Sequence, residues 1–419
     1  LGHKLTNDLP LATLKLFTGL TDLRITRRTS KRRIEELLDQ VVSPLRLNKL
    51  KFYDFRYAYD RHLERFTNLT DLRLQTGFGK PGNLTDDTCR ALTNLRVLGL
   101  EQETLVTNAG LAALKNLEQL YFDDGARPTL VKITDVSPLS NLTVLCVGDM
   151  PDFDFHSLRD LPGITALAMK KEPLNFDAQQ LASMTQLKCL ALLKDREFRE
   201  FGDAELEQLT NLRSLIMECG DNITDESIGK LTLLQQLSFC RGTRHRIQFS
   251  PQAVAPLVQN LVYLEVGHSH GQRELGAAVA TLTNLTALNF REDYSGVITN
   301  ADIAPLTKLR SLRLPPAPRD KARNSPTEWQ ALRDMPNLTL LDIGSPSGES
   351  PGVDDAILYT LTQLEWLDVS YNDKITDAAL RNLTNLVTLY AMRNKVLTLE
   401  PLLLMPRLRF VANFDCKFL

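Results

Sequence analysis

The sequence predicts an α/β solenoid of about seventeen similar coils, stacked into a horseshoe with a parallel β-sheet on the concave face and short helices on the convex face. Two observations predict this fold. A phrase close to Leu-Thr-Asn-Leu-Thr-x-Leu-x-Leu recurs along the chain, for example over residues 66–74 and 282–290. Successive copies are 22 to 29 residues apart, which is the length of one coil. The second apolar residue of the phrase falls at Leu20, Leu47, Leu69, Leu95, Leu117, Leu142, Ile164, Leu187, Leu212, Leu234, Leu261, Leu285, Leu309, Leu338, Leu364, Leu386 and Leu408.

A single domain is predicted over residues 1–419, because a repeat array grows by adding coils along one axis and needs no second core. The first coil is expected near residues 17–25 and the last near residues 405–413. A helical insertion is expected over about residues 30–42, where a basic run leads into an apolar segment. Apolar residues make up 43% of the chain, charged residues 24%, and the formal net charge is -2, as in an ordinary soluble protein.

Each strand is predicted at the Leu-x-Leu end of the phrase. In the coil of residues 66–74, Leu72 and Leu74 should point into the core while Asp71 and Arg73 face outward, since side chains alternate along a strand. The Thr-Asn step before each strand suits a tight turn, because Asn tolerates the left-handed region and can bond nearby backbone groups.

Short helices are predicted between the strands, over residues such as 85–92, 224–231 and 376–383. Each segment begins with a Thr that can cap free amide groups, places acids in the first turn and carries apolar residues at helical spacing. Strands about 4.8 Å apart on one face and wider helices on the other should bend the stack.

These motifs resemble leucine-rich repeats. The Leu-Thr-Asn-Leu phrase is similar to the short repeats of phosphatase-regulator and internalin-type proteins, whereas Ile223-Thr224-Asp225 and the matching residues 375–377 resemble the cysteine-containing repeats of F-box ubiquitin-ligase adaptors. The resemblance implies an Asn or Cys beyond the strand that bonds the backbone of neighbouring coils. Asn372 and Asn394 hold that place here.

Apolar residues occupy outward positions in the middle of the chain, where a solvated sheet normally carries polar side chains. They are Val144, Cys146, Ala166, Ala168, Cys189, Ala191, Leu193 and Ile216. Exposed apolar surface of this kind marks interaction sites, so we expect a protein partner to bind here. The alternative is that small residues are tolerated in a crowded floor or one covered by a loop of the same chain.

Aromatic and charged residues adjoin at the outward positions nearer the C-terminus, which include Tyr263, Trp366, Asp368 and Tyr390. Such mixtures anchor protein interfaces, so these residues are also predicted to contact the partner. Phe410 and Phe414 either join them, seal the end of the core or contact a further C-terminal segment.

Basic residues gather after several strands and should follow one edge of the horseshoe. This predicted basic edge consists of Arg241, Arg244, Arg246, Arg291, Arg319, Lys321 and Arg323. A basic edge beside a binding face could steer an acidic partner, although each loop taken alone is also explained by solvation.

The six cysteines are scattered singly through the repeats, which favours reduced thiols and a cytoplasmic location. The apolar runs are far shorter than the roughly 20 residues needed to cross a bilayer, so no membrane partner is predicted.

No reaction chemistry is predicted for this chain. His268-Ser269-His270 has no third metal ligand at a recognised spacing, and there is no Gly-rich phosphate loop, paired Cys-x-x-Cys or nucleophile elbow. We therefore expect no catalytic residues, no metal and no cofactor. The basic edge is too short, and the chain too acidic, for a nucleic-acid partner.

The sequence thus favours a noncatalytic, monomeric scaffold or adaptor that recognises another protein through its concave face and the basic edge. Two alternatives stay open, since one scaffold hosts many roles. The chain could be the substrate-recognition module of a larger enzyme, such as a ubiquitin ligase or a bacterial effector injected into a host cytosol. It could also be a surface adhesion protein.

Overall fold

The computed structural model contains two compact units, Leu1–Glu200 and Phe201–Leu419. It describes residues 3–5, 20–25, 38, 46–52, 60–74, 84–100, 105–122, 133–148, 150, 152–173, 175–193, 198–218, 222–239, 250–267, 274–291, 298–315, 329–344, 352–398 and 400–412. The predicted insertion over residues 30–42 lies outside the described residues except for Leu38, which is buried. The prediction of one continuous domain stays a prediction.

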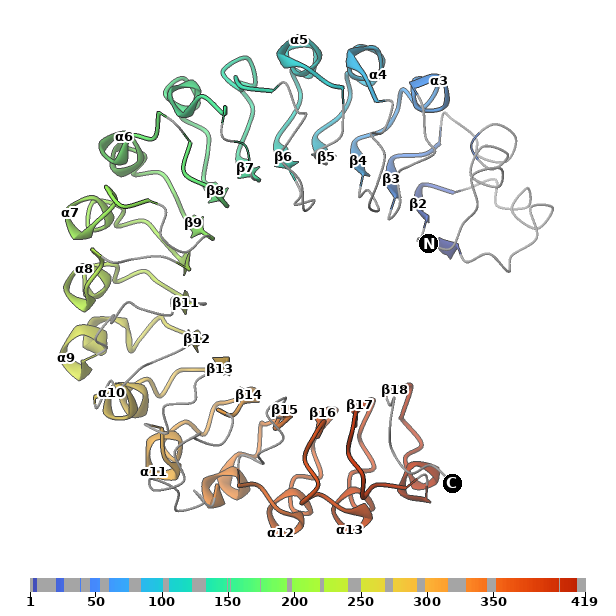
Figure 1. The fold of residues 1–419 in the computed structure, drawn as a ribbon, viewed down its shortest axis with the longest axis vertical. Helices are drawn as coiled ribbons and strands as arrows, with labels where there is room; N and C mark the ends of the chain where they lie inside the picture. Colours follow the sequence, from blue (N-terminus) through green and yellow to red (C-terminus); the bar gives the residue numbers. More distant parts are fainter. Residues whose placement is uncertain are drawn as a thin grey trace. The chain divides into compact units, whose positions relative to one another are not determined.

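The first unit is a stack of coils built on a parallel sheet (Figure 1). Its strands are β1 (His3–Leu5), β2 (Asp22–Ile25), β3 (Lys49–Phe52), β4 (Asp71–Leu74), β5 (Val97–Leu100), β6 (Gln119–Phe122), β7 (Val144–Val147), β8 (Ala166–Met169) and β9 (Cys189–Leu192). The helices are α3 (Asp60–Leu63), α4 (Asp86–Ala91), α5 (Asn108–Leu111), the 3-10 helix η2 (Phe155–Leu158) and α6 (Ala178–Ser183). Strand β1 pairs with β2 ahead of the first predicted coil and carries no copy of the phrase, so the sequence pattern missed it.

The second unit repeats this plan. Its strands are β10 (Ser214–Met217), β11 (Gln236–Phe239), β12 (Tyr263–Gly267), β13 (Ala287–Arg291), β14 (Ser311–Arg313), β15 (Leu340–Asp342), β16 (Trp366–Asp368), β17 (Thr388–Tyr390) and β18 (Phe410–Ala412). The helices are α7 (Asp203–Leu206), α8 (Asp225–Gly229), α9 (Pro251–Val254), η3 (Ala255–Leu257), α10 (Leu275–Thr281), α11 (Asn300–Ile303), η5 (Gln330–Asp334), α12 (Asp355–Leu358), α13 (Asp377–Leu380) and η6 (Glu400–Leu404). In each unit the strands lie on one face of the stack and the helices on the other (Figure 1).

The core of each unit is formed by the apolar residues of the phrase. Every one of the seventeen positions named above is fully buried except Leu20 and Leu408, in the first and last copies of the phrase, which are partly exposed. The inward strand residues, such as Leu72 and Leu74, are buried as well. A coil of this length cannot bury its apolar side alone, so the leucines of one coil pack on those of the next and make the stack continuous within each unit.

Alternation along the strands is confirmed, with one correction. Leu72 and Leu74 of β4 are buried and Arg73 is partly exposed, as predicted. Asp71, predicted to face solvent, is only 7% exposed. It lies on the outward side, but Lys51 and Arg73 cover it and neutralise its charge.

The turn before each strand does not use Asn as predicted. Among the described non-glycine residues only Phe198, Tyr371 and Arg393 have positive φ, so the Asn of the Thr-Asn step is not left-handed. Its side chain instead reaches the preceding coil. The Nδ2 atoms of Asn94, Asn116, Asn141, Asn260, Asn284, Asn337 and Asn385 donate to backbone carbonyl oxygens 23 to 30 residues earlier in the sequence. The side chain of this Asn therefore links each coil to the preceding one by a hydrogen bond.

The predicted helix caps are confirmed. The hydroxyl oxygens of Thr85, Thr224 and Thr376 each accept a hydrogen bond from the backbone N–H two residues later, at the start of α4, α8 and α13. These bonds satisfy amide groups that the first helical turn leaves free.

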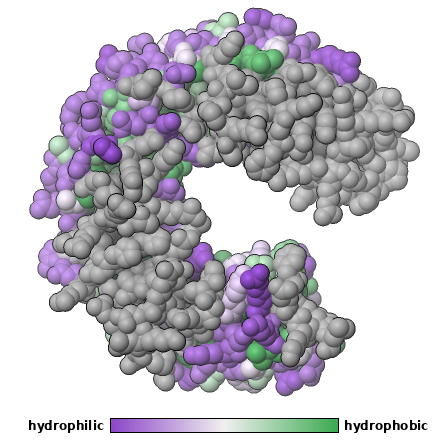
Figure 2. Space-filling view, viewed as in Figure 1, coloured by the Kyte–Doolittle hydropathy of each residue, from purple (hydrophilic) through white to green (hydrophobic). Residues whose placement is uncertain are grey.

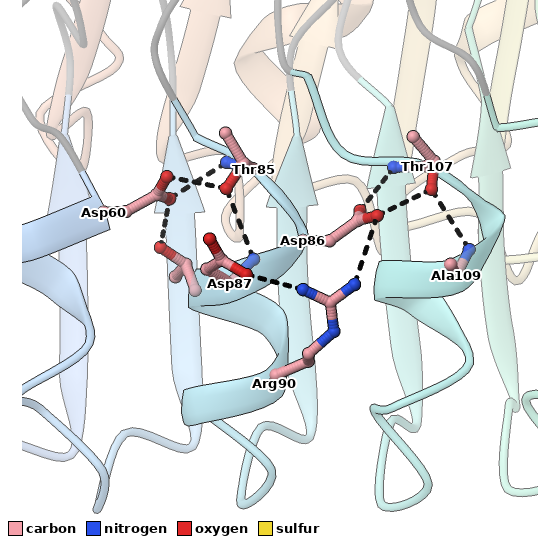
Figure 3. A network of polar contacts seen from close by, with 8 residues as sticks. Asp60, Thr85, Asp86, Asp87, Arg90, Thr107 and Ala109 are labelled. Atoms are coloured by element: carbon pink, nitrogen blue, oxygen red, sulfur yellow. Dashed lines mark hydrogen bonds and ion pairs between the residues drawn. The ribbon is translucent and has the colours of Figure 1, made fainter.

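A second use of these Thr residues was not predicted. The first residue of helix α3, Asp60, accepts hydrogen bonds from Thr85 N at 2.9 Å and Thr85 Oγ1 at 2.7 Å (Figure 3). Asp86, the first residue of α4, holds Thr107 of the following coil in the same way, with both distances 2.8 Å (Figure 3). In the second unit the same pairing joins Asp203 to Thr224, Asp225 to Ser250, Asp355 to Thr376 and Asp377 to Thr398. We call these pairs the cap ladder.

The cap ladder also dictates the third residue of some helices. Ser227 Oγ donates to Asp203 of the preceding coil, and Thr88 Oγ1 donates to Asp60 at 2.5 Å. In α5 this position is Gly110, where an added Cβ would lie 2.2 Å from Asp86 Oδ1. At Asp203 burial acts to raise the pKa, but the hydrogen bonds from Ser227 and Thr224 outweigh it, and the pKa lies below its ordinary value.

The neighbouring residues Asp86 and Asp87 provide a matched test of the cap ladder. Both lie in the first turn of α4, but Asp86 holds Thr107 whereas the exposed Asp87 bonds Arg90. Asp86→Ala should lower the free energy of unfolding by about 1–3 kcal/mol, because two donors of Thr107 lose their acceptor. Asp87→Ala should cost less than about 0.5 kcal/mol, as expected for an exposed ion pair. Urea titrations followed by circular dichroism measure both, and equal losses would show that the ladder adds nothing.

Candidate interaction surface

The outward side chains of the first unit stand in two rows on its strand face, because the parallel strands pair in register. The first row contains Asp22, Lys49, Asp71, Val97, Gln119, Val144, Ala166 and Cys189. The second contains Arg24, Lys51, Arg73, Gly99, Tyr121, Cys146, Ala168 and Ala191. Both rows change from charged to apolar along the unit.

At the charged end the residues neutralise one another. Arg73 Nε lies 3.0 Å from Asp71 Oδ1, and Lys51 Nζ lies 3.6 Å from Asp71 Oδ2. The Arg73 guanidinium also lies over the Tyr121 ring, 5.2 Å from its centroid. Gly99 stands between the two in the row. These charged groups therefore pair with one another within the unit and leave little net charge to attract a partner.

At the other end the predicted apolar residues lie side by side. The register places Val144, Ala166 and Cys189 in one row and Cys146, Ala168 and Ala191 in the other. Leu193 follows β9, and all seven are partly or fully exposed. We call these residues the apolar floor. Ile216, predicted with them, lies on β10 of the second unit beside Ser238 and is partly exposed.

Two thiols belong to the apolar floor. Cys146 is partly exposed, Cys189 is exposed, and both are free cysteines. Cys89, behind the sheet in α4, is also free, but burial raises its pKa to about 12, with the nearby carboxylates of Asp86 and Asp60 adding to the effect. A thiol of that kind is unreactive, so Cys89 belongs to the core.

The strand face of the second unit also carries two rows. The first contains Ser214, Gln236, Tyr263, Ala287, Ser311, Leu340, Trp366, Thr388 and Phe410. The second contains Ile216, Ser238, Glu265, Asn289, Arg313, Asp342, Asp368, Tyr390 and Ala412. The first row is mainly apolar or aromatic, while the middle of the second is charged.

Tyr263, predicted to contact a partner, is bonded within the unit. Its hydroxyl donates to Glu265 Oε2 at 2.9 Å, and Ser238 Oγ donates to the same oxygen at 2.9 Å. Asn289 Nδ2 donates to Glu265 Oε1 at 3.1 Å. Glu265 is thereby held at 8% exposure, which a carboxylate tolerates only when its oxygens are hydrogen-bonded. The Tyr263 ring remains partly exposed.

Trp366 and Tyr390 form a cluster with Phe410. The ring centroids of Trp366 and Tyr390 are 5.3 Å apart, and those of Tyr390 and Phe410 are 5.4 Å apart. Phe410 is 48% exposed, so it does not seal the core in the described structure, and its neighbour Val411 is 37% exposed. We call Trp366, Tyr390 and Phe410 the aromatic cluster. Phe414 lies outside the described residues.

Two carboxylates lie directly across from each other beside the aromatic cluster. Asp342 and Asp368 are register partners on β15 and β16. Arg313 Nε approaches Asp342 Oδ2 at 3.1 Å, and Gly344 N donates to Asp342 Oδ1 at 3.0 Å. Burial and the Asp368 charge raise the pKa of Asp342 to about 6, although Arg313 acts in the opposite direction.

The Asn residues beyond β16 and β17 decide which kind of solenoid this is. Asn394 is fully buried, its Nδ2 donates to Asn372 O at 2.7 Å, and its Oδ1 accepts from Val396 N and Leu397 N at 2.9 and 3.0 Å. One side chain thus bonds its own coil and the preceding one, as the resemblance to leucine-rich repeats implies for this position. The coils are leucine-rich repeats. The predicted leucine-rich-repeat solenoid, with its parallel sheet and short helices, is confirmed.

No family model and no curated protein sequence matches the chain. Several solved leucine-rich-repeat structures are similar to it. A leucine-rich-repeat protein of Leptospira interrogans is 17% identical over 99% of this chain and 95% of that one, with a TM-score of 0.43. An internalin of Listeria monocytogenes is 20% identical over 97% and 90%, with a TM-score of 0.30. The TLR13–ssRNA13 complex is 16% identical over 94% and 63%, with a TM-score of 0.48. Since none of these scores reaches 0.5, the assignment rests on the coils of this chain.

The predicted basic edge lies almost wholly outside the described residues. Arg241, Arg244, Arg246, Arg319, Lys321 and Arg323 are not described, and neither is the segment of residues 268–270. Arg291 is the last residue of β13, where its backbone pairs with Gly267. The basic edge therefore stays a prediction.

The helix face offers a different kind of surface. In Figure 2 the described surface over the helices of the first unit is mostly hydrophilic, with separate hydrophobic patches.

No group of three or more His, Cys, Asp or Glu suited to a metal ion occurs among the described residues. Within the same residues, no helix has the length and apolar character to cross a membrane.

Several outward residues of the second unit were missed by the sequence interpretation. They are Leu340, which lies beside Trp366, and the polar residues Ser238, Glu265, Asn289, Arg313 and Asp342. The alternation rule that identified Trp366 and Asp368 also points to these positions. Taking every first and third strand residue, instead of selecting aromatic ones, would have found them.

The raised pKa of Asp342 predicts an unusual pH dependence of stability. Its folded pKa of about 6 exceeds the ordinary 3.8, so between these values the folded chain binds more protons than the unfolded chain. Raising the pH from about 4 to about 7 should therefore reduce the contribution of this group to stability by about 1–3 kcal/mol.

This contribution is measured as the difference between the wild type and Asp342→Asn. Urea titrations at several pH values should show the free energy of unfolding of the wild type falling relative to that of the variant as the pH rises. Asp334→Asn, at an exposed position of η5, is the control and should leave the pH profile of the wild type unchanged. Parallel profiles for the wild type and Asp342→Asn would show that Asp342 is not penalised by burial.

Proposed function

We propose that this leucine-rich-repeat chain is a noncatalytic scaffold that binds another protein on its strand face. The observation that carries the proposal is the apolar floor, where Ala168, Ala191 and Cys189 present accessible apolar surface on a sheet whose other end is charged. Accessible apolar surface beside polar surface is characteristic of protein interaction sites.

The construction of the coils supports this role. Apart from Leu193, the residues of the floor stand on β7, β8 and β9, which pair with one another in order. The inward residues of these strands, such as Leu145, Leu167 and Leu190, are buried. Small side chains such as Ala166 and Ala168 lose little conformational freedom when a partner docks. A surface ordered in advance spends less free energy on binding, so a modest apolar area can suffice.

The finer features of the role are also proposals. The scaffold is an adaptor that acts as a single continuous domain and a monomer, in the cytoplasm, with a protein rather than a nucleic acid as its partner. A formal net charge of -2 favours this choice, because nucleic-acid binding needs concentrated positive charge. The basic edge would speed the approach of an acidic partner without contributing much to the final affinity.

Placing charge on the apolar floor tests the function. The double variant Ala168→Arg with Ala191→Arg should abolish capture of the partner from a lysate of the source organism, because two buried guanidinium groups would face apolar partner surface. Its melting temperature should change little, since both side chains point outward.

A matched control carries the same two charges on the helix face. Ala109→Arg with Ala204→Arg changes two exposed residues of α5 and α7 and should capture the same proteins as the wild type, measured by quantitative mass spectrometry. Capture that survives in the floor variant, or is lost equally in the control, would contradict the proposal.

A further inference from the structure

The strand face over β15 to β18 combines two features that the apolar floor lacks. The aromatic cluster exposes ring surface, and the carboxylates of Asp342 and Asp368 lie in the same row as Tyr390, with Asp368 one coil away from it and Asp342 two. Aromatic faces and carboxylates together are the surroundings that a guanidinium group prefers, because it stacks on rings and bonds carboxylates in a planar fork.

The carboxylates are not balanced by the cations around them. Glu265, Asp342 and Asp368 stand in one row with a single guanidinium, that of Arg313, which pairs with Asp342. Within the described part of the chain, no lysine or arginine forms an ion pair with Asp368, whose Oδ1 accepts one hydrogen bond, from Ser370 N at 2.8 Å. This row is therefore negative at neutral pH and can attract one more cation.

Arg313 does not fully offset the burial of Asp342 and its proximity to Asp368. Asp342 is 9% exposed, and its pKa is raised to about 6 despite the nearby Arg313, first because of burial and then because of Asp368. A cation placed between Asp342 and Asp368 would relieve both the like-charge contact and the poor solvation of the pair.

The backbone approaches this pair closely at Gly344. An added Cβ there would be 2.8 Å from Asp368 Oδ1 and 3.3 Å from Asp342 Oδ1. Any side chain at this position would crowd the two carboxylates. Trp366 occupies the neighbouring row on the same strand as Asp368, so ring surface and carboxylate stand side by side.

We propose that the strand face over β15 to β18 binds an arginine-bearing segment of the partner protein, with the guanidinium between Asp342 and Asp368 and an adjacent apolar side chain on the aromatic cluster. This inference rests on the proposed function, in which strand faces receive a protein. It adds the location on the second unit and the chemistry of the segment that is recognised.

The probe for this site is a fluorescein-labelled peptide of sequence Gly-Leu-Arg-Leu-Arg-Gly with a blocked C-terminus, titrated with the full chain and followed by fluorescence anisotropy. Binding should weaken by about tenfold or more in Asp342→Asn with Asp368→Asn, because the guanidinium loses its two charged acceptors. Asp368→Asn alone, at a partly exposed position, should show part of the loss with little effect on folding.

Three controls define the chemistry. Asp334→Asn with Glu226→Gln makes the same change in charge at exposed positions of η5 and α8, and should change the affinity by less than about twofold. The same peptide with Glu in place of Arg should not bind. Trp366→Ala should weaken the Arg peptide without removing its dependence on salt, since the ion pairs remain.

The inference is overturned by any of three results. These are no binding of the Arg peptide up to about 1 mM, equal affinity for the wild type and the double Asp variant, or displacement of the peptide by tetramethylammonium as effective as by free arginine amide. The last result would mean a site for alkylammonium groups rather than for arginine. Failure of these peptide experiments while Ala168→Arg with Ala191→Arg still loses the partner would reject only this inference and leave the proposed function standing.

Discussion

Register between successive coils is the constraint on which the rest of the structure depends. The buried leucines fix how far each coil advances, but an apolar stack alone tolerates sliding. The cap ladder and the Asn hydrogen bonds between coils prevent this sliding. Asp86 accepts from both donors of Thr107, and Asn94 Nδ2 donates to Thr67 O. Polar groups at both ends of the coil are thereby satisfied only in one register. The two outward rows of each strand face exist because that register is kept.

The repeat made the inward half of the fold predictable. A phrase that places Leu72 and Leu74 two residues apart specifies both a strand and its buried side, and a Thr before two acids specifies the start of α4. These features are local in sequence, so spacing and residue type suffice. The same argument explains why β1 was missed, because it pairs with β2 without a copy of the phrase.

Contacts between coils were harder to predict, because their partners are more than twenty residues apart. Nothing local distinguishes Asp86, which holds the next coil, from Asp87, which meets only its own helix. Likewise Asp71 was assigned to solvent because alternation gives the side of the sheet but not the covering by Lys51 and Arg73. Glu265 and Asp342 became visible as a charged row only when neighbouring strands were aligned.

The two units apply the same scaffold to different surfaces. In the first, small apolar side chains make a floor with little relief, while in the second, aromatic rings stand beside carboxylates. Inward positions are restricted to Leu and similar residues, but outward positions face no such restriction, so the binding surface can vary without disturbing the stack.

Hydroxyl-radical oxidation mapped by mass spectrometry tests most directly whether the outward strand face is the surface that binds the partner. In the free chain the partly exposed Trp366 should be oxidised readily and the buried Trp329 hardly at all, and the captured partner should protect Trp366 and Tyr390. Equal protection of Trp366 and Trp329 in the free chain, or protection by the partner confined to the helix face, would contradict the account.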